Sequence, residues 1–117
     1  MKTLLLTMDL EEFVTPEEIG MKIKKEEMFK ISIEGLKNFK KILNKHKELK
    51  ITFFTTWEFA EKAEKQIKEI LKTGKHELAL HGLKHSLNYP KMEEKELIKI
   101  LTKAKNNLEN KFKIKSF

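Results

Sequence analysis

The 117-residue sequence contains no cysteine, and this absence removes several kinds of chemistry. Disulfide bonds, thiolate metal sites and a cysteine nucleophile are excluded, so any metal ion must be bound by histidine, aspartate or glutamate side chains. No apolar run approaches the roughly 18 residues of a membrane-spanning helix. Low-complexity tracts, linkers and internal repeats are also absent, and we expect residues 1–117 to form a single domain.

The amino terminus lacks the features of a secretory leader. Residues 1–10, MKTLLLTMDL, begin with a basic residue and a short apolar run, as signal peptides do. The run is interrupted by Asp9, and two glutamates follow where a cleavage site would require small residues. We therefore expect a cytoplasmic protein that makes no contact with a membrane.

The chain is basic, but its charges are mixed. A net charge of +7, from 25 basic and 18 acidic residues, is found in many proteins that bind nucleic acid or anionic membranes. Here lysines alternate with glutamates, as in EKAEKQIKEILK (residues 61–72), which is typical of a solvated helix face. We expect no nucleic-acid partner; binding that weakens steeply with salt would indicate the opposite.

Short apolar runs alternate with longer segments of helical period. The pattern predicts strands at residues 3–10, 50–55, 76–80 and 113–117, and helices from about residue 15 and over residues 32–47, 56–71 and 92–110. Such alternation favours an α/β architecture of parallel strands joined by right-handed crossovers. In such sheets, functional groups gather where the carboxyl ends of the strands meet.

Two of these predicted strand ends carry residues suited to metal chemistry. Asp9 and Glu11 stand at the carboxyl end of the first strand and share one side of the chain, because side chains alternate along a strand. After the third strand, HGLKH places His81 and His85 at a spacing that lets both reach one ion. Two imidazoles and one carboxylate make a three-ligand site that leaves positions open for water and substrate, and a nearby carboxylate can act as a base.

Each motif also has a plain structural explanation. A lone pair of histidines at this spacing is common on protein surfaces, and carboxylates after a strand often cap the next loop or helix. The ends of the first and third strands would face each other if these strands are neighbours in the sheet. We expect the other two histidines, His46 and His76, to be solvated or structural.

Taken together, three segments resemble the amino-terminal half of the polysaccharide deacetylase domain, the NodB-homology domain of carbohydrate esterase family 4. They are LTMDLEE (residues 6–12), KITFFTTWEFAEK (residues 50–62) and GKHELALHGLKHS (residues 74–86). The order and spacing of the three segments match those of the family. The resemblance implies part of a distorted (β/α) barrel.

The resemblance also assigns roles to four residues. Asp9 matches the catalytic base, Glu11 the acidic metal ligand, and His81 and His85 the histidine ligands of a divalent ion, expected to be Zn²⁺. The implied reaction is the hydrolysis of a non-peptide C–N bond, which removes acetyl groups from N-acetylated sugars. The sequence departs from the family at Glu11, where many members have aspartate, and at Ser86, where proline is common.

Some family motifs have no counterpart in the 117 residues. These are an arginine, a later aspartate and a carboxy-terminal histidine that acts as general acid. We therefore expect an incomplete domain, which is either a fragment of a longer protein or a chain that pairs with itself or with a second chain supplying the missing half. Two functions stay open: a metal-dependent deacetylase that is weak alone, and a degenerate or accessory module that keeps the metal and has no turnover.

Overall fold

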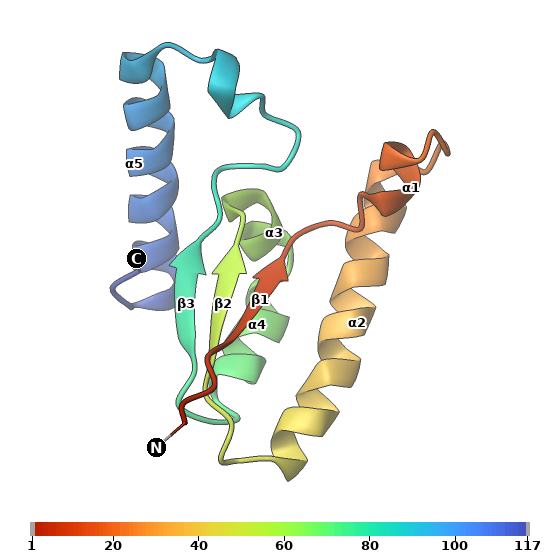
Figure 1. Ribbon diagram of the computed structural model, residues 1–117, viewed down its shortest axis with the longest axis vertical. Helices are drawn as coiled ribbons and strands as arrows, with labels where there is room; N and C mark the ends of the chain where they lie inside the picture. Colours follow the sequence, from red (N-terminus) through yellow and green to blue (C-terminus); the bar gives the residue numbers. More distant parts are fainter. Residues whose placement is uncertain (1, 117) are drawn as a thin grey trace.

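A three-stranded parallel sheet forms the centre of the molecule. The structure, a computed structural model, describes residues 2–116. Its strands are β1 (Leu6–Leu10), β2 (Ile51–Thr55) and β3 (Glu77–Leu80), in the order β1-β2-β3. The register pairs Met8 with Phe53 and Phe53 with Leu78, so all three strands have their carboxyl ends at the same edge (Figure 1).

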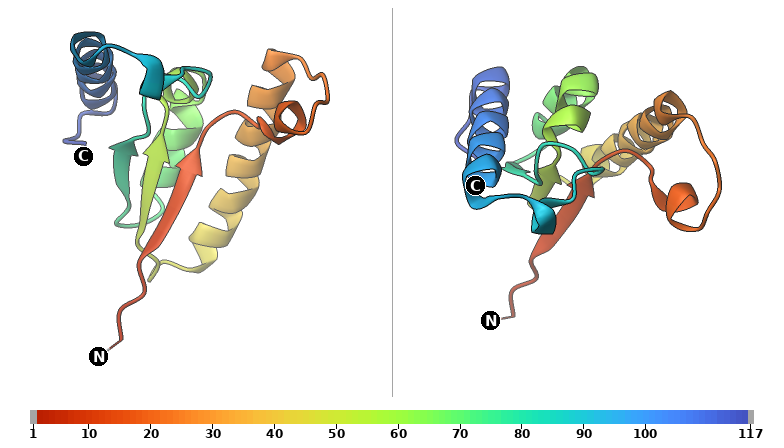
Figure 2. Two further views of the ribbon diagram at one scale, coloured as in Figure 1. Left: turned by 45° about the horizontal axis from the view of Figure 1, so that its top comes forward. Right: turned by 90° about the horizontal axis from the view of Figure 1, so that it is seen from above.

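With the exception of the first, short helix, which lies beside the start of the next one (Figure 1), the helices lie along one face of this sheet. The helices are α1 (Thr15–Glu18), α2 (Lys25–Lys45), α3 (Trp57–Lys62), α4 (Glu64–Leu71) and α5 (Glu94–Phe112), with a 3-10 turn η1 (Tyr89–Lys91) before α5. Seen from above, α2, the α3–α4 pair and α5 stand in a row behind the strands (Figure 2). This one-sided arrangement is that of a segment of a (β/α) barrel, in which helices form only the outer layer.

Strand alternation decides which side chains enter the core. In β2, Ile51, Phe53 and Thr55 are buried, whereas Thr52 and Phe54 between them are partly exposed. The buried positions pack with apolar residues of the helices, among them Leu36, Leu43, Phe59, Ile67 and Leu108. The other face of the sheet carries residues that keep contact with solvent, and Asp9 is one of them.

The fold class expected from the sequence is confirmed, with changes in element length. The helix expected over residues 32–47 begins at Lys25, because Met28 and Phe29 bury their side chains and extend the apolar face by more than a turn. The helix expected over residues 56–71 is broken at Ala63, whose backbone leaves the helical region (φ −105°, ψ 22°). Thr56 caps it as the sequence indicates: its hydroxyl accepts a hydrogen bond from the amide of Phe59 (3.1 Å).

The fourth strand expected at residues 113–117 is wrong for residues 113–116, and Phe117 lies outside the described residues. Lys113 adopts a left-handed conformation (φ 55°) that ends α5 and reverses the chain. The following segment then folds back onto the helix, where the amide of Ser116 donates to the side chain of Glu109 (2.9 Å). The backbone amide of Ser116 is therefore hydrogen-bonded to Glu109 of α5, whereas in a fourth strand it would have been available to a neighbouring strand.

Both edges of the sheet are open within residues 2–116, since β1 and β3 pair only with β2. None of the helices in this range combines the length and the apolar character needed to cross a membrane.

Candidate metal and catalytic site

The candidate site lies at the carboxyl edge of the sheet, where backbone hydrogen bonds hold the outgoing segments together. The amide of Thr56 donates to the carbonyl of Leu10 (3.2 Å), and the amide of His81 donates to the carbonyl of Thr55 (2.7 Å). β1 and β3 are not neighbours, because β2 lies between them. The segments that leave β1 and β3 nevertheless approach each other across the end of β2.

Glu11 brings the two histidines to one carboxylate. Its Oε2 lies 3.5 Å from Nε2 of His81, and its Oε1 lies 3.8 Å from Nε2 of His85. Asp9 stands beside this group, with Oδ2 3.9 Å from the same nitrogen of His81. All four residues singled out in the sequence therefore meet at one place, although they come from two segments far apart in the chain.

The carboxylate of Glu11 is largely buried, and one of its oxygens lacks a hydrogen-bond partner in the described structure. Its side chain is only 22% exposed, and its buried Oε2 makes no hydrogen bond in the described structure. Burial raises the pKa of Glu11 above its usual value, and the nearby carboxylates of Asp9 and Glu12 raise it further. His85 and His81 lower that pKa without reversing the shift. A bound cation would stabilise the charged form of this largely buried carboxylate, which has two further acids beside it.

The donors suit a divalent metal ion in kind and nearly in spacing. Two ligands about 2.0–2.1 Å from a tetrahedral zinc lie about 3.3 Å apart. The two Glu11–histidine separations, 3.5 and 3.8 Å, exceed this by a few tenths of an ångström. As they stand, no three His, Asp or Glu side chains within residues 2–116 are grouped so that all could hold one ion. The residues present fit a zinc ion in the chemistry of their donor atoms, although their side chains are not grouped around one point.

Asp9 differs from Glu11 in its exposure. Its side chain is 55% exposed and lines a groove of about 300 Å³ that runs between β1 and α2. Glu11 shares this groove, whose walls include Leu36 and Phe39. Asp9 is therefore open to water and to a bound molecule, as a base would need to be, whereas Glu11 is enclosed, as a ligand would be.

The remaining histidines lie away from this edge, in agreement with the sequence. His76 precedes β3, and its ring accepts a hydrogen bond from the amide of Ile51 at Nδ1 (3.3 Å) and contacts the hydroxyl of Thr73 at Nε2 (2.9 Å). Burial and the charge of Lys47 lower the pKa of His76. His46 is exposed at the end of α2.

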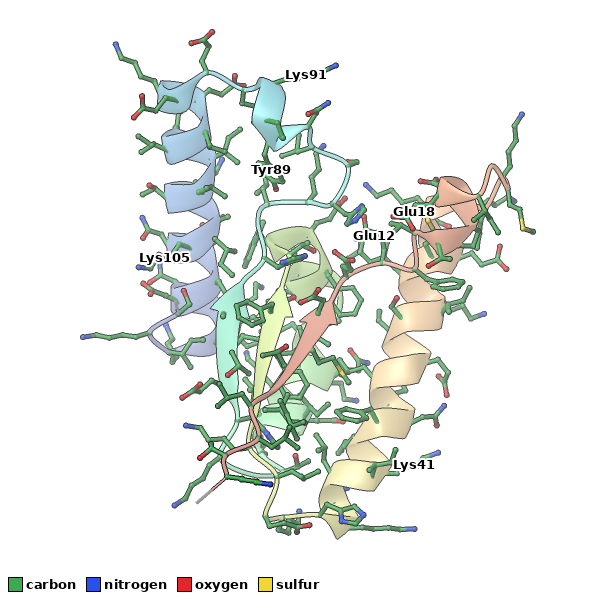
Figure 3. All side chains as sticks on the ribbon, viewed as in Figure 1. Glu12, Glu18, Lys41, Tyr89, Lys91 and Lys105 are labelled. Carbon is green, nitrogen blue, oxygen red and sulfur yellow. The ribbon has the colours of Figure 1, made fainter. Side chains whose placement is uncertain are left out.

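Sequence reasoning missed three residues near the site. Glu12 is 4% exposed, and one of its oxygens, like one of Glu58, is buried without a hydrogen-bond partner in the described structure. Glu12 lies on the segment that leaves β1 (Figure 3). The third residue, Tyr89, binds the loop between the two histidines, and no short sequence motif indicates this contact.

Comparison of the sequence with known protein families identifies the family of this chain. Residues 33–116 match the polysaccharide deacetylase family. The chain belongs to this family. The matched segment contains His81 and His85, whereas Asp9 and Glu11 precede it, so the assignment of the two acids depends on the geometry described above.

A solved structure shares the fold. The crystal structure of PuuE allantoinase superposes with a TM-score of 0.63 at 18% sequence identity, covering 96% of this chain. The chain spans 43% of the length of that protein. No curated protein matches the sequence. The likeness to the allantoinase supports the fold, a parallel α/β arrangement resembling part of a (β/α) barrel.

Proposed function

We propose that the chain carries the base and the metal ligands of a hydrolase that removes acetyl groups from N-acetylated sugars. In this proposal Glu11, His81 and His85 hold a divalent ion, with zinc the best match to the donor set. The observation that carries the proposal is the position of the Glu11 carboxylate between the two imidazoles, 3.5 Å from one and 3.8 Å from the other. Family membership supports the reaction class.

Each residue has a separate task in this reaction. A bound divalent ion would act as a Lewis acid and make water more acidic. Asp9, exposed beside His81, would accept a proton from the water that attacks the acetyl carbonyl. When the C–N bond breaks, acetate leaves and the departing amine takes up a proton. His81 and His85 are engaged as ligands, so a further group must supply that proton, and losing such an acid costs about 10²–10⁴ in rate.

We further infer that a second copy of this chain covers the open edges of the sheet. Apolar side chains lie beside both edges. Leu36 and Phe39 line the groove along β1, and Leu80 and Leu101 line a cavity of about 590 Å³ beside β3. Unpaired parallel edges next to apolar grooves favour association. Light scattering should give the mass of a dimer or larger species, and a strictly monomeric species would count against this inference.

One pair of measurements tests the proposed function. Zinc binding to the purified protein is measured by calorimetry beside an assay for acetate release from N-acetylated sugars, for the wild type and for His81→Ala. His46→Ala serves as the matched control, because His46 is exposed and lies at the far end of α2. We expect one zinc per site in the wild type and in the control, and none in His81→Ala. Absence of zinc binding in the wild type would refute the proposal.

A second function, metal binding without turnover, is favoured by one observation. The side chain of Asp9 is 55% exposed, which leaves the site open to water. Such a site can bind an ion without excluding the solvent that competes with substrate. Stoichiometric zinc with no acetate released from any substrate would support this function.

A further inference from the structure

The hydroxyl of Tyr89 is bonded to the loop that joins the two candidate histidine ligands. It accepts hydrogen bonds from the amides of Leu83 (2.8 Å) and Lys84 (3.3 Å), and it donates one to the carbonyl of Lys84 (3.0 Å). Leu83 and Lys84 lie between His81 and His85 in the sequence. One phenol group therefore fixes the backbone that sets the separation of the two imidazoles.

The same loop is held from its other side by the start of α3. The amide of Trp57 donates to the carbonyl of Gly82, and the amide of Glu58 donates to the carbonyl of Leu83, both at 2.9 Å. The loop is thus bonded to α3 on one side and to Tyr89 on the other. Two-sided attachment leaves little freedom for a connector that has no regular secondary structure.

Gly82 makes the approach of Tyr89 possible. A Cβ atom at this position would lie 2.5 Å from the Tyr89 hydroxyl oxygen and 3.0 Å from the ring carbon that bears it. Gly82 also has a φ of +94°, a conformation that other residues rarely adopt. The glycine and the tyrosine therefore form a matched pair, in which the missing side chain of one makes room for the hydroxyl of the other.

Tyr89 is itself anchored outside the loop. It begins the η1 turn, where its carbonyl accepts a hydrogen bond from the amide of Met92 (3.1 Å). Its side chain shares a cavity wall with Leu97 and Leu101 of α5. Figure 3 shows Tyr89 beside the chain that leaves β3, between this loop and η1. The phenol thus connects α5 and its preceding turn to the candidate ligands.

We propose that Tyr89 is a positioning residue, which holds His81 and His85 at the separation needed to bind one divalent ion together with Glu11. This inference rests on the proposed function, since it assumes that the two imidazoles are ligands. Tyr89 contacts neither the imidazoles nor Glu11 among the hydrogen bonds described. It acts through the backbone of the connector, so its loss weakens binding without removing a donor atom.

The test compares Tyr89→Phe with a variant that loses a hydroxyl elsewhere. Phenylalanine keeps the ring in its cavity and removes all three hydrogen bonds to the loop. Thr73→Val is the control, because the Thr73 hydroxyl is also hydrogen-bonded and buried but lies at the amino end of β3. Zinc alone is titrated into each protein by calorimetry. We expect Tyr89→Phe to raise the dissociation constant about 10-fold, the lower end of the range for groups that orient ligands, and Thr73→Val to leave it unchanged.

Amide hydrogen exchange separates this inference from the proposed function. Exchange at Leu83 and Lys84 should become faster in Tyr89→Phe and stay as in the wild type in Thr73→Val. Wild-type zinc affinity in Tyr89→Phe would overturn the inference while leaving the proposed function intact. If the wild type binds no zinc, the proposed function fails, and unchanged exchange at Leu83 and Lys84 in Tyr89→Phe would then also refute the positioning role.

A second variant tests the contact from its other side. Gly82→Ala places a methyl group where the Tyr89 hydroxyl sits. It should weaken zinc binding in the same direction as Tyr89→Phe, and combining the two changes should cost less than the sum of their separate effects, because both disrupt one contact. Fully additive effects would show that the glycine and the tyrosine act independently.

Discussion

Replacing Glu11 by glutamine should change stability and metal binding in opposite directions. Glutamine has nearly the same shape but carries no charge. In the metal-free protein, the Glu11 carboxylate is mostly buried, one oxygen has no partner, and Asp9 and Glu12 add negative charge nearby. A buried polar group without a partner costs roughly 1–3 kcal/mol, and the lower end applies here because the side chain keeps some contact with water. Glu11→Gln should therefore stabilise the metal-free protein by about 1 kcal/mol, or about 4 °C in Tm.

The pH dependence of stability is a second test of whether Glu11→Gln stabilises the metal-free protein. Because the folded pKa of Glu11 is raised, its protonated form is favoured in the folded state. The stability that this group contributes is complete below its unfolded pKa, near 4.5, and is lost as pH rises through the raised folded value. Glu11→Gln should remove that loss, so the advantage of the variant should be largest near neutral pH and vanish in acid.

Zinc binding should respond in the opposite way. The amide oxygen of glutamine is a far weaker metal ligand than a carboxylate. Mutating residues that only hydrogen-bond to metal ligands already lowers metal affinity about 10–100-fold, so we expect Glu11→Gln to lower zinc affinity at least about 100-fold. For zinc binding, Glu12→Gln is the matched control, since it makes the same change one residue away at a side chain that is not a proposed ligand. Thermal unfolding with a chelator and calorimetry with zinc measure the two effects. A less stable metal-free Glu11→Gln, or one that binds zinc as the wild type does, would refute the reasoning.

Three further predictions concern the scaffold. The pKa of His76 is lower in the folded protein than its ordinary value of 6.5, so neutral His76 stabilises the fold above that pH, and this contribution is lost as the pH falls through the folded pKa. The free energy of unfolding of His76→Asn should therefore decrease less than that of the wild type between about pH 7 and 5. A slope equal to that of the wild type would contradict this. Thr56→Ala removes the cap of α3 and should cost about 1 kcal/mol in chemical denaturation, and no loss would mean that the cap is dispensable. Leu43 is fully buried in α2, so Leu43→Ala should lower the free energy of unfolding by about 2–5 kcal/mol. Its neighbour Ile42 is half exposed, so Ile42→Ala should change this free energy by no more than about 0.5 kcal/mol. Equal losses in the two variants would be inconsistent with the described packing.

The sequence predicts the positions of the strands well because apolar runs such as ITFFT leave few alternatives. It also locates the candidate site, since parallel strands bring Asp9, Glu11, His81 and His85 to one edge whichever strands are neighbours. What it does not predict is that β2 separates the two contributing segments. Strand order depends on contacts between residues distant in the sequence, and the periodicity of one segment carries no information about them.

The errors have a similar origin. Residues 113–116 have the composition of a strand, and the competing hydrogen bonds, which the amide and the hydroxyl of Ser116 donate to Glu109, depend on the way α5 ends. The break at Ala63 is equally hidden, because alanine is a good helix former. In the structure the two halves contact different helices, α3 lying against α5 and α4 against α2. The role of Tyr89 depends on a hydroxyl meeting a backbone six residues earlier, through a loop without regular structure.

The separation of β1 from β3 by a central strand has a consequence for folding. Glu11 belongs to the first third of the chain and His81 to the last, so an ion that binds both would tie together segments that meet only after all three strands have docked. In a protein without disulfides, that ion would act as a removable cross-link. Its contribution would follow the free zinc concentration, reaching about 2.7 kcal/mol at a hundredfold excess over Kd, so the melting temperature would serve as a gauge of metal supply.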